Sequence, residues 1–296
     1  MTMSTHLPAK RLGLNVPTGW WAAPSLLKPF EAAGFGRVQI QAPPARILSD
    51  TRLSTSHAAA LAQALATTAL EPVVHAPPDL TLGTRASDLA GEGLLSYAAE
   101  IGATHVVYHA CARPDLPGGQ DALLFEARSL AARARRAERL GVTIAVENLA
   151  PVFPGREVLA AHPMTLRSLA QRISSDGVGV CLDVGHAHIV ADLRRTSLDE
   201  LIEPVLDIVT LWHVHDNFGA RWQATGIEAG VDPLKLDLHL PPGGGTVPWE
   251  WLAPRLVRHQ APLVLEVHPP YRAPAGELLG SFTELLGDRD EALAAA

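Results

Sequence analysis

The sequence predicts a single (βα)₈ barrel, and three observations support this fold class. Short runs rich in Val, Ile and Leu alternate with Ala-, Leu- and Arg-rich stretches along the chain. Eight such pairs follow one another with no block left over, which favours a closed parallel barrel. The length of 296 residues also suits one barrel, since these domains typically contain about 250 residues.

The strand candidates are short apolar runs, as expected for parallel strands that are buried on both faces. They are Leu12–Val16, Arg37–Gln41, Pro72–Ala76, His105–Ala110, Val142–Asn148, Val178–Val184, Ile208–His215 and Pro262–His268. An open, doubly wound sheet would usually bring a Gly-rich turn after its first strand. The segment Pro17-Thr18-Gly19-Trp20-Trp21 that follows the first run is not such a turn.

The helix candidates lie between these runs, and many of them begin with Ser, Thr, Asp or Pro and end before a glycine. They are Pro24–Ala33, Thr55–Leu70, Ser87–Ile101, Asp121–Leu140, Thr165–Ser174, Ser197–Leu206, Pro248–Arg258 and Gly276–Leu286. Thr55 or Ser54 is placed to cap the second of them. Because no internal repeat and no linker divides the chain, we expect residues 1–296 to form one domain.

The composition is that of a globular protein, with 47% hydrophobic and 19% charged residues. The net charge of −7 opposes binding to duplex nucleic acid, which usually requires a basic face. The two cysteines do not indicate a disulfide framework, and Met1–Lys10 lacks the apolar core of a signal peptide. No stretch approaches the ~20 apolar residues of a membrane span. These features favour a cytoplasmic protein with no membrane partner.

Polar residues end most of the strand candidates, at the end of a barrel where chemistry takes place. They are His75, His109, Glu147 with Asn148, Asp183 with His186, His213 with His215 and Asp216, and Glu266. The loop after the seventh strand candidate adds Asp237 and His239. Each of them alone is weak evidence, because a strand histidine is often a satisfied core residue. Together they place several carboxylates in one small space, where these would repel one another unless cations neutralised them.

A divalent metal site follows from this pattern. Asp, Glu and neutral His are the ligands that Zn²⁺ and Mn²⁺ take in proteins. The residues alone do not decide between these metals, and one to three ions could be held.

Three segments carry a resemblance to a known superfamily. They are Val180-Cys181-Leu182-Asp183-Val184-Gly185-His186, His213-Val214-His215-Asp216-Asn217 and Asp237-Leu238-His239-Leu240-Pro241-Pro242-Gly243-Gly244-Gly245. With the strand-end residues, they resemble the xylose isomerase-like barrels of AP endonuclease family 2. That superfamily includes sugar isomerases and epimerases as well as endonuclease IV, and the resemblance covers nearly the whole chain.

The resemblance implies two alternative ligand sets. The epimerase branch holds one metal ion, and its ligands fall on Glu147, Asp183, His213 and Glu266. The endonuclease IV branch holds three zinc ions, and its ligands fall on His75, His109, Glu147, Asp183, His186, His213, Asp237, His239 and Glu266. His215 competes with His213, which is preferred because the family pattern His-x-x-Asp is fixed in register by Asp216.

One departure from the family separates the two activities. Endonuclease IV opens DNA with aromatic and apolar wedge residues just after its third-strand histidine. Here that stretch is Ala76-Pro77-Pro78-Asp79-Leu80, which contains no aromatic residue. Since flipping a nucleotide costs a few kcal/mol and needs such a filler, DNA is not favoured as a partner.

Three functions therefore stay open. The first is isomerisation or epimerisation of a small sugar or sugar phosphate, with Glu147 and Glu266 transferring the proton. The second is phosphoester hydrolysis by several zinc ions, and the third is a degenerate, metal-binding barrel. Asn148 and Asp216 are expected to orient ligands, and Trp20 and Trp21 either wall a sugar pocket or plug the barrel mouth. The substrate and the oligomeric state are not indicated.

Overall fold

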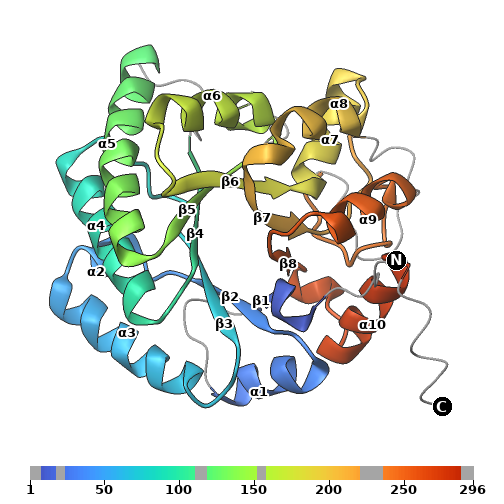
Figure 1. The fold of residues 1–296 in the computed structure, drawn as a ribbon, viewed down its shortest axis with the longest axis horizontal. Coiled ribbons are helices and arrows are strands. Elements are labelled where there is room, and N and C mark those ends of the chain that lie inside the picture. The colour runs from blue at the N-terminus through green and yellow to red at the C-terminus, as the bar shows by residue number, and fades with distance from the viewer. Residues whose placement is uncertain (1–7, 18–23, 111–118, 152–157, 221–235, 288–296) are drawn as a thin grey trace, which may run out of the picture.

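The structure is a computed structural model that describes residues 8–17, 24–110, 119–151, 158–220 and 236–287. It confirms the predicted fold class: eight parallel strands close into a barrel in chain order, and helices surround it (Figure 1). The strands are β1 (Leu12–Asn15), β2 (Arg37–Gln41), β3 (Glu71–His75), β4 (His105–Tyr108), β5 (Thr143–Glu147), β6 (Val178–Asp183), β7 (Val209–Val214) and β8 (Leu263–Leu265). The barrel closes where β1 pairs with β8, Leu12 lying opposite Leu263.

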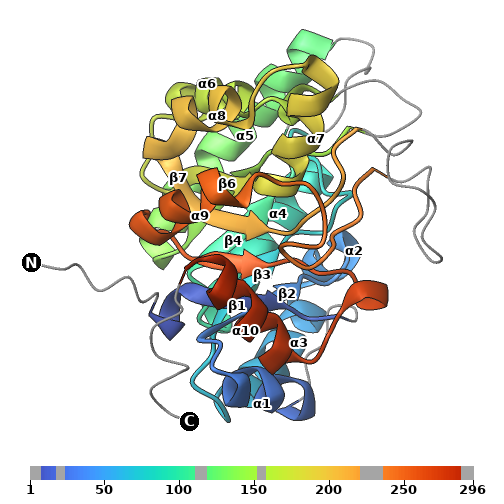
Figure 2. The same cartoon turned by 90° about the vertical axis from the view of Figure 1, so that its right-hand side faces the viewer.

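The helices form a ring around these strands, and the side view shows α5, α6 and α8 on the opposite side of the molecule from α1 (Figure 2). The α-helices are α1 (Pro24–Ala33), α2 (Ala45–Leu48), α3 (Thr51–Leu65), α4 (Arg85–Glu100), α5 (Gly119–Leu140), α6 (Pro163–Ile173), α7 (Val184–Arg194), α8 (Leu198–Ile202), α9 (Trp249–Arg258) and α10 (Ala275–Leu285). Short 3₁₀ helices are η1 (Ala9–Arg11), η2 (Leu159–Ala161), η3 (Glu203–Ile208) and η5 (Pro269–Tyr271). Among the described residues, none of these helices combines the length and the apolarity that crossing a membrane requires.

The start of α3 differs from the sequence-based expectation. The helix begins at Thr51, because the Asp50 side chain accepts hydrogen bonds from the backbone N–H groups of Arg52 and Leu53 at 3.0 and 3.1 Å. A carboxylate at the N-cap satisfies two otherwise unpaired donors of the first turn. Asp50 therefore does what Ser54 or Thr55 was expected to do.

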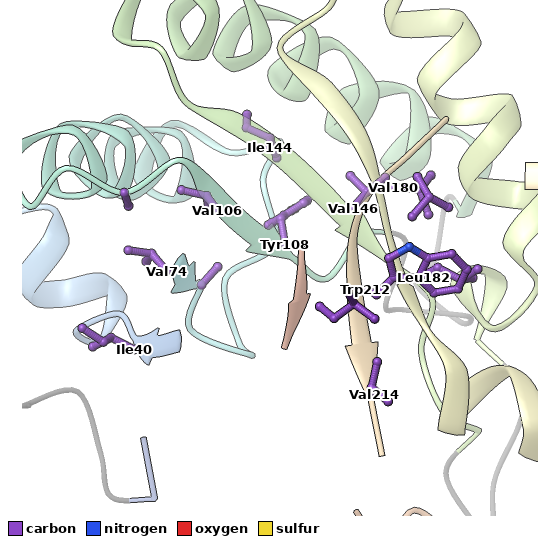
Figure 3. Close-up of a cluster of buried hydrophobic side chains, with 14 of the residues drawn as sticks. Ile40, Val74, Val106, Tyr108, Ile144, Val146, Val180, Leu182, Trp212 and Val214 are labelled. Atoms are coloured by element: carbon purple, nitrogen blue, oxygen red, sulfur yellow. The ribbon is translucent and has the colours of Figure 1, made fainter. Parts of the chain in front are cut away.

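The larger of two apolar layers lies between the strands and the helices. Figure 3 shows strand side chains of this layer, among them Val74, Ile144, Val180 and Trp212. Alternate residues of a strand point to opposite faces of the sheet, so the residues between them point into the barrel.

The smaller layer fills the barrel interior. It consists of Val73, Val107, Ala145, Cys181, Leu211 and Val264, all fully buried. In each of these six strands, the residue two positions after the layer residue lies at the C-terminal end of the strand. Its side chain points to the same side of the sheet, into the barrel. The residues at those positions are His75, His109, Glu147, Asp183, His213 and Glu266. The strand period thus brings six of the predicted site residues together above an apolar floor.

Candidate metal centre

The polar residues at the barrel mouth gather into three groups, and a fourth set of Glu147, Cys181 and His213 overlaps the first of them. The four-residue inner group consists of Glu147, Asp183, His213 and Glu266. The second group is His75, His109 and Glu147, and the outer group is His186, His215, Asp237 and His239. Within each group, one potential ligand atom of every residue lies within 4.8 Å of the others. Such clusters have the composition and size that a bound divalent ion needs.

The inner group is centred on one nitrogen of His213. Its Nδ1 lies 2.7 Å from Glu147 Oε1, 3.4 Å from Glu266 Oε2 and 3.9 Å from Asp183 Oδ2. His213 and Asp183 are completely buried, and Glu147 is only 1% exposed. Three carboxylates therefore converge on one imidazole nitrogen away from bulk water.

Glu147 also belongs to the second group. Its other carboxylate oxygen, Oε2, lies 2.8 Å from His109 Nε2 and 3.4 Å from His75 Nε2. One carboxylate thus extends one oxygen to the inner group and the other to the second group. A bridging arrangement of this kind allows two ions to share a ligand.

The outer group joins the start of α7 and the end of β7 to the loop before α9. The Nε2 atoms of His186 and His239 lie 3.3 and 3.1 Å from Asp237 Oδ2. His239 has a φ of 51°, a left-handed conformation that is uncommon for a residue other than glycine. Backbone strain of this kind persists where surrounding interactions hold it, and it is common at functional sites.

Asp216 fixes this loop on the end of β7. Its buried carboxylate accepts hydrogen bonds from the N–H groups of Asn217, Gly243 and Val247 and from Trp249 Nε1, at 2.7 to 3.1 Å. The sequence predicts that Asp216 orients metal ligands, and the contacts of its side chain are with the loop that carries Asp237 and His239.

Asn148, which follows β5, holds the end of β6 in place. Its amide donates to the Asp183 carbonyl at 2.8 Å and accepts from the Asp183 N–H at 2.7 Å. Its own carbonyl lies 2.8 Å from His186 Nδ1. Asn148 therefore supports members of both the inner and the outer group.

Hydrogen bonds to main-chain carbonyls fix the orientation of three histidines. The Nδ1 atoms of His75, His186 and His239 lie 2.8, 2.8 and 3.0 Å from the carbonyl oxygens of Ala76, Asn148 and Glu266. Because a carbonyl only accepts, each Nδ1 carries the proton, and each Nε2 is directed at a carboxylate.

The electrostatics of the mouth favour positive charge. Burial would lower the pKa of His213, but Cys181, Glu266 and Glu147 raise it well above its usual range. Burial would also lower the pKa of His239, but Asp237 and the neighbouring carboxylates raise it to about 9. Burial would raise the pKa of Glu147, yet the imidazole of His213 and its neighbours hold it well below its usual range.

Two buried oxygens test whether these residues fit a metal. Glu147 Oε2 and Asp237 Oδ1 accept no hydrogen bond of regular geometry among the described residues, although His109 Nε2 lies 2.8 Å from Glu147 Oε2. Each of these carboxylates faces imidazole nitrogens that carry a lone pair and no proton when the ring is neutral. A cation between the carboxylate and these nitrogens would remove the repulsion between their lone pairs. The donor set of oxygens and imidazole nitrogens fits Zn²⁺ or Mn²⁺.

The structure separates the two histidines that compete in the sequence. His213 lies in the inner group, whereas His215 lies in the outer group, with its Nε2 2.9 Å from Asp183 Oδ1. Gly185 makes room for the His215 ring, because a Cβ there would meet His215 Cε1 at 2.1 Å. Sequence reasoning did not assign His215 to this group.

One buried polar residue was missed altogether. Gln39 of β2 is 3% exposed, accepts from His213 Nε2 at 2.7 Å through Oε1, and donates to Glu266 Oε1 through Nε2. The signal was present as a polar residue in the middle of an apolar strand. The predicted pocket residues Trp20 and Trp21 lie outside the described residues.

Solved structures with the same fold cover nearly the whole chain. A D-tagatose 3-epimerase-like protein superimposes with a TM-score of 0.71 at 22% identity, over 96% of this chain and 99% of the other. A D-psicose 3-epimerase gives 0.64 at 14% identity, over 96% and 97% of the two chains. A protein from Thermus thermophilus, soaked with ZnCl₂, gives 0.63 at 23% identity, over 94% and 98%. At these identities the likeness establishes the fold.

No curated protein matches the sequence significantly. The family model described as xylose isomerase-like TIM barrel matches residues 27–285, which is most of the chain. The chain therefore belongs to the xylose isomerase-like TIM barrel family.

Proposed function

We propose that this protein is a divalent-metal-dependent isomerase or epimerase that acts on a small sugar or sugar phosphate. The observation that carries the proposal is the inner group, in which Glu147 and Glu266 lie 2.7 and 3.4 Å from the same nitrogen of His213. Two carboxylates beside one metal position are what proton removal and return on a sugar carbon require.

The chemistry divides between the ion and the two glutamates. A bound Zn²⁺ or Mn²⁺ would polarise a sugar carbonyl and its neighbouring hydroxyl, which acidifies the hydrogen on the carbon between them. Glu147 and Glu266 approach from β5 and from the end of β8, so one can take the proton and the other can return it. Asp183 and His213 complete the proposed ligand set.

A small substrate is supported by the charge and by the relatives. The net charge of −7 opposes the phosphate attraction on which DNA affinity depends. Two of the similar structures, a tagatose 3-epimerase-like protein and a psicose 3-epimerase, are named for ketohexoses. We therefore place ketoses and their phosphates first among the candidate substrates.

Hydrogen exchange in deuterated water tests this function. Protein loaded with Mn²⁺ or Zn²⁺ is incubated with ketoses and their phosphates, and deuterium on sugar carbon is followed by mass spectrometry. We expect exchange, and we expect Glu266→Gln to reduce it by roughly 10²–10⁴-fold while the circular dichroism spectrum stays unchanged.

The matched control is Glu126→Gln. Glu126 is also buried, but its Oε1 accepts from the Tyr108 hydroxyl at 2.7 Å, away from the three groups. This variant should exchange hydrogen as the unmodified protein does. Full exchange in Glu266→Gln would remove Glu266 from the mechanism.

A second function, multi-zinc phosphoester hydrolysis, is favoured by one specific observation. His75, His109 and the outer group lie at the mouth although a one-metal epimerase does not need them. Two ions sharing Glu147 could activate a water and stabilise the leaving oxygen. Phosphate release or nicking of an abasic duplex at low salt with added Zn²⁺, without any carbon-bound hydrogen exchange, would favour this function over the first.

A further inference from the structure

We infer that Gln39 is a positioning residue that selects which nitrogen of His213 and which oxygen of Glu266 face the metal position. The inference rests on the proposed metal centre. The side-chain hydrogen bonds of Gln39 are with His213 and Glu266. Gln39 acts through two members of the inner group, and it does so from β2, a strand that supplies no proposed ligand.

The orientation of the Gln39 amide follows from its two partners. The Glu266 carboxylate only accepts hydrogen bonds when it is ionised, so the Gln39 NH₂ group must face it. The amide oxygen then faces His213 Nε2 at 2.7 Å, and this nitrogen must carry a proton. The reversed amide would set two acceptors against each other at Glu266, so the network has one consistent arrangement.

This arrangement leaves His213 Nδ1 for the ion. Nδ1 is the nitrogen that faces Glu147, Glu266 and Asp183. Neutral imidazole carries only one proton, and Gln39 holds it on Nε2. A metal ion bound at Nδ1 would take the place of the additional proton that the charged ring carries there, so His213 would be an Nδ1 ligand.

His213 differs in this respect from the other fixed histidines. His75, His186 and His239 use nearby main-chain carbonyls, which hold Nδ1 and leave Nε2 for the ligand role. His213 lies inside β7, in register with Asp183 of β6 and Val264 of β8, where main-chain groups are committed to the ladder. A side chain from across the barrel therefore takes the place of the carbonyl.

The same amide also constrains Glu266. Its donation to Oε1 leaves Oε2 as the oxygen that faces His213 Nδ1 at 3.4 Å. One glutamine thus sets the geometry of two of the four inner residues. Loss of its amide should disturb both, even though the fold keeps the same strands.

The test uses Gln39→Leu, Gln39→Glu and the control Gln41→Leu. Gln41 lies on the same strand, but its amide donates to the main-chain carbonyls of His75 and Ala76 at 3.3 and 2.8 Å. Long-range proton–nitrogen NMR of the zinc-loaded proteins identifies the protonated nitrogen of His213, assigned by its loss in His213→Asn. Titration with a chelator of known affinity, followed on the same signal, gives the zinc affinity of the inner group.

We expect the unmodified protein and Gln41→Leu to show zinc on Nδ1 and the proton on Nε2. Gln39→Leu should lose this preference and weaken inner-group zinc affinity by roughly 10–100-fold. Gln39→Glu should keep the His213 arrangement, because a carboxylate still accepts from Nε2, while it loses the hydrogen bond to Glu266.

Unchanged affinity and an unchanged His213 signal in Gln39→Leu would overturn the inference. The proposed function is judged separately, by hydrogen exchange on sugars. Absence of exchange with every sugar, together with the expected changes in Gln39→Leu, would reject the reaction and leave the role of Gln39 intact.

Discussion

Histidines lie at both ends of this barrel, and their pKa values move in opposite directions. At the mouth, the pKa of His213 is raised well above its usual range although burial alone would lower it. The base is the end of the barrel where the strands begin, and His105 is the first residue of β4 there. Burial together with the positive charge of Arg37 lowers the pKa of His105 to about 4. Burial penalises the charged imidazole at both places, so the neighbouring charges decide the outcome.

The two ends differ in how deeply their carboxylates are buried. At the base, Arg37 pairs with Glu71 at 2.6 Å, and the Glu71 side chain is 40% exposed. At the mouth, buried carboxylates surround the imidazoles instead. The carboxylates of the mouth therefore favour a charged imidazole, whereas burial and Arg37 disfavour one at the base.

The largest expected effect comes from replacing the carboxylate that two groups share. Glu147→Gln removes the negative charge from the inner and the second group together, so any zinc ions held by these two groups should bind far more weakly. Turnover should fall by roughly 10²–10⁴-fold. Zinc per chain and the exchange rate are the measurements, with Glu126→Gln as the control, and unchanged zinc content would contradict the shared role of Glu147.

A smaller effect is expected at the base and concerns stability against pH. The pKa of His105 is lowered from the ordinary 6.5 to about 4, so folding disfavours its protonated form. Stability from this residue is present above pH 6.5 and is lost as the pH falls towards 4. At about 1.36 kcal/mol for each pKa unit, the loss amounts to about 3 kcal/mol.

The variant His105→Gln removes this titration. Its unfolding free energy, measured with urea between about pH 7 and pH 4, should fall less than that of the unmodified protein. The histidines of the mouth titrate in both proteins, so the difference isolates His105. Parallel curves for the two proteins would show that His105 is not held neutral.

Much of this organisation could be predicted from the sequence because it depends on a simple period. Parallel strands buried on both faces produce continuous apolar runs, and their ends were recognisable from single polar residues such as Glu147 and Glu266. Since all parallel strands end on the same side, the gathering of these residues follows from the fold class. The loop pair Asp237 and His239 was noted as polar residues of the same pattern, and the family resemblance assigned both as metal ligands.

The rest depends on contacts between residues that are far apart in the chain. Gln39 lies 174 positions from His213, and no local pattern marks their hydrogen bond. His215 was ambiguous because it lies two residues after His213 and so points to the same side, and only its contacts with distant residues such as His239 and Asp237 assign it to the outer group. Asp216 resembled a ligand-orienting residue, but its partners are N–H groups of a loop whose path the sequence did not reveal.

The number of zinc ions per chain, measured by native mass spectrometry after zinc loading and removal of excess metal, tests the central claim most directly. The three groups predict three zinc ions in the unmodified protein. They predict two in Asp237→Asn, because this substitution alters only the outer group. A protein that retains no zinc, or a zinc count that Asp237→Asn leaves unchanged, would contradict the account.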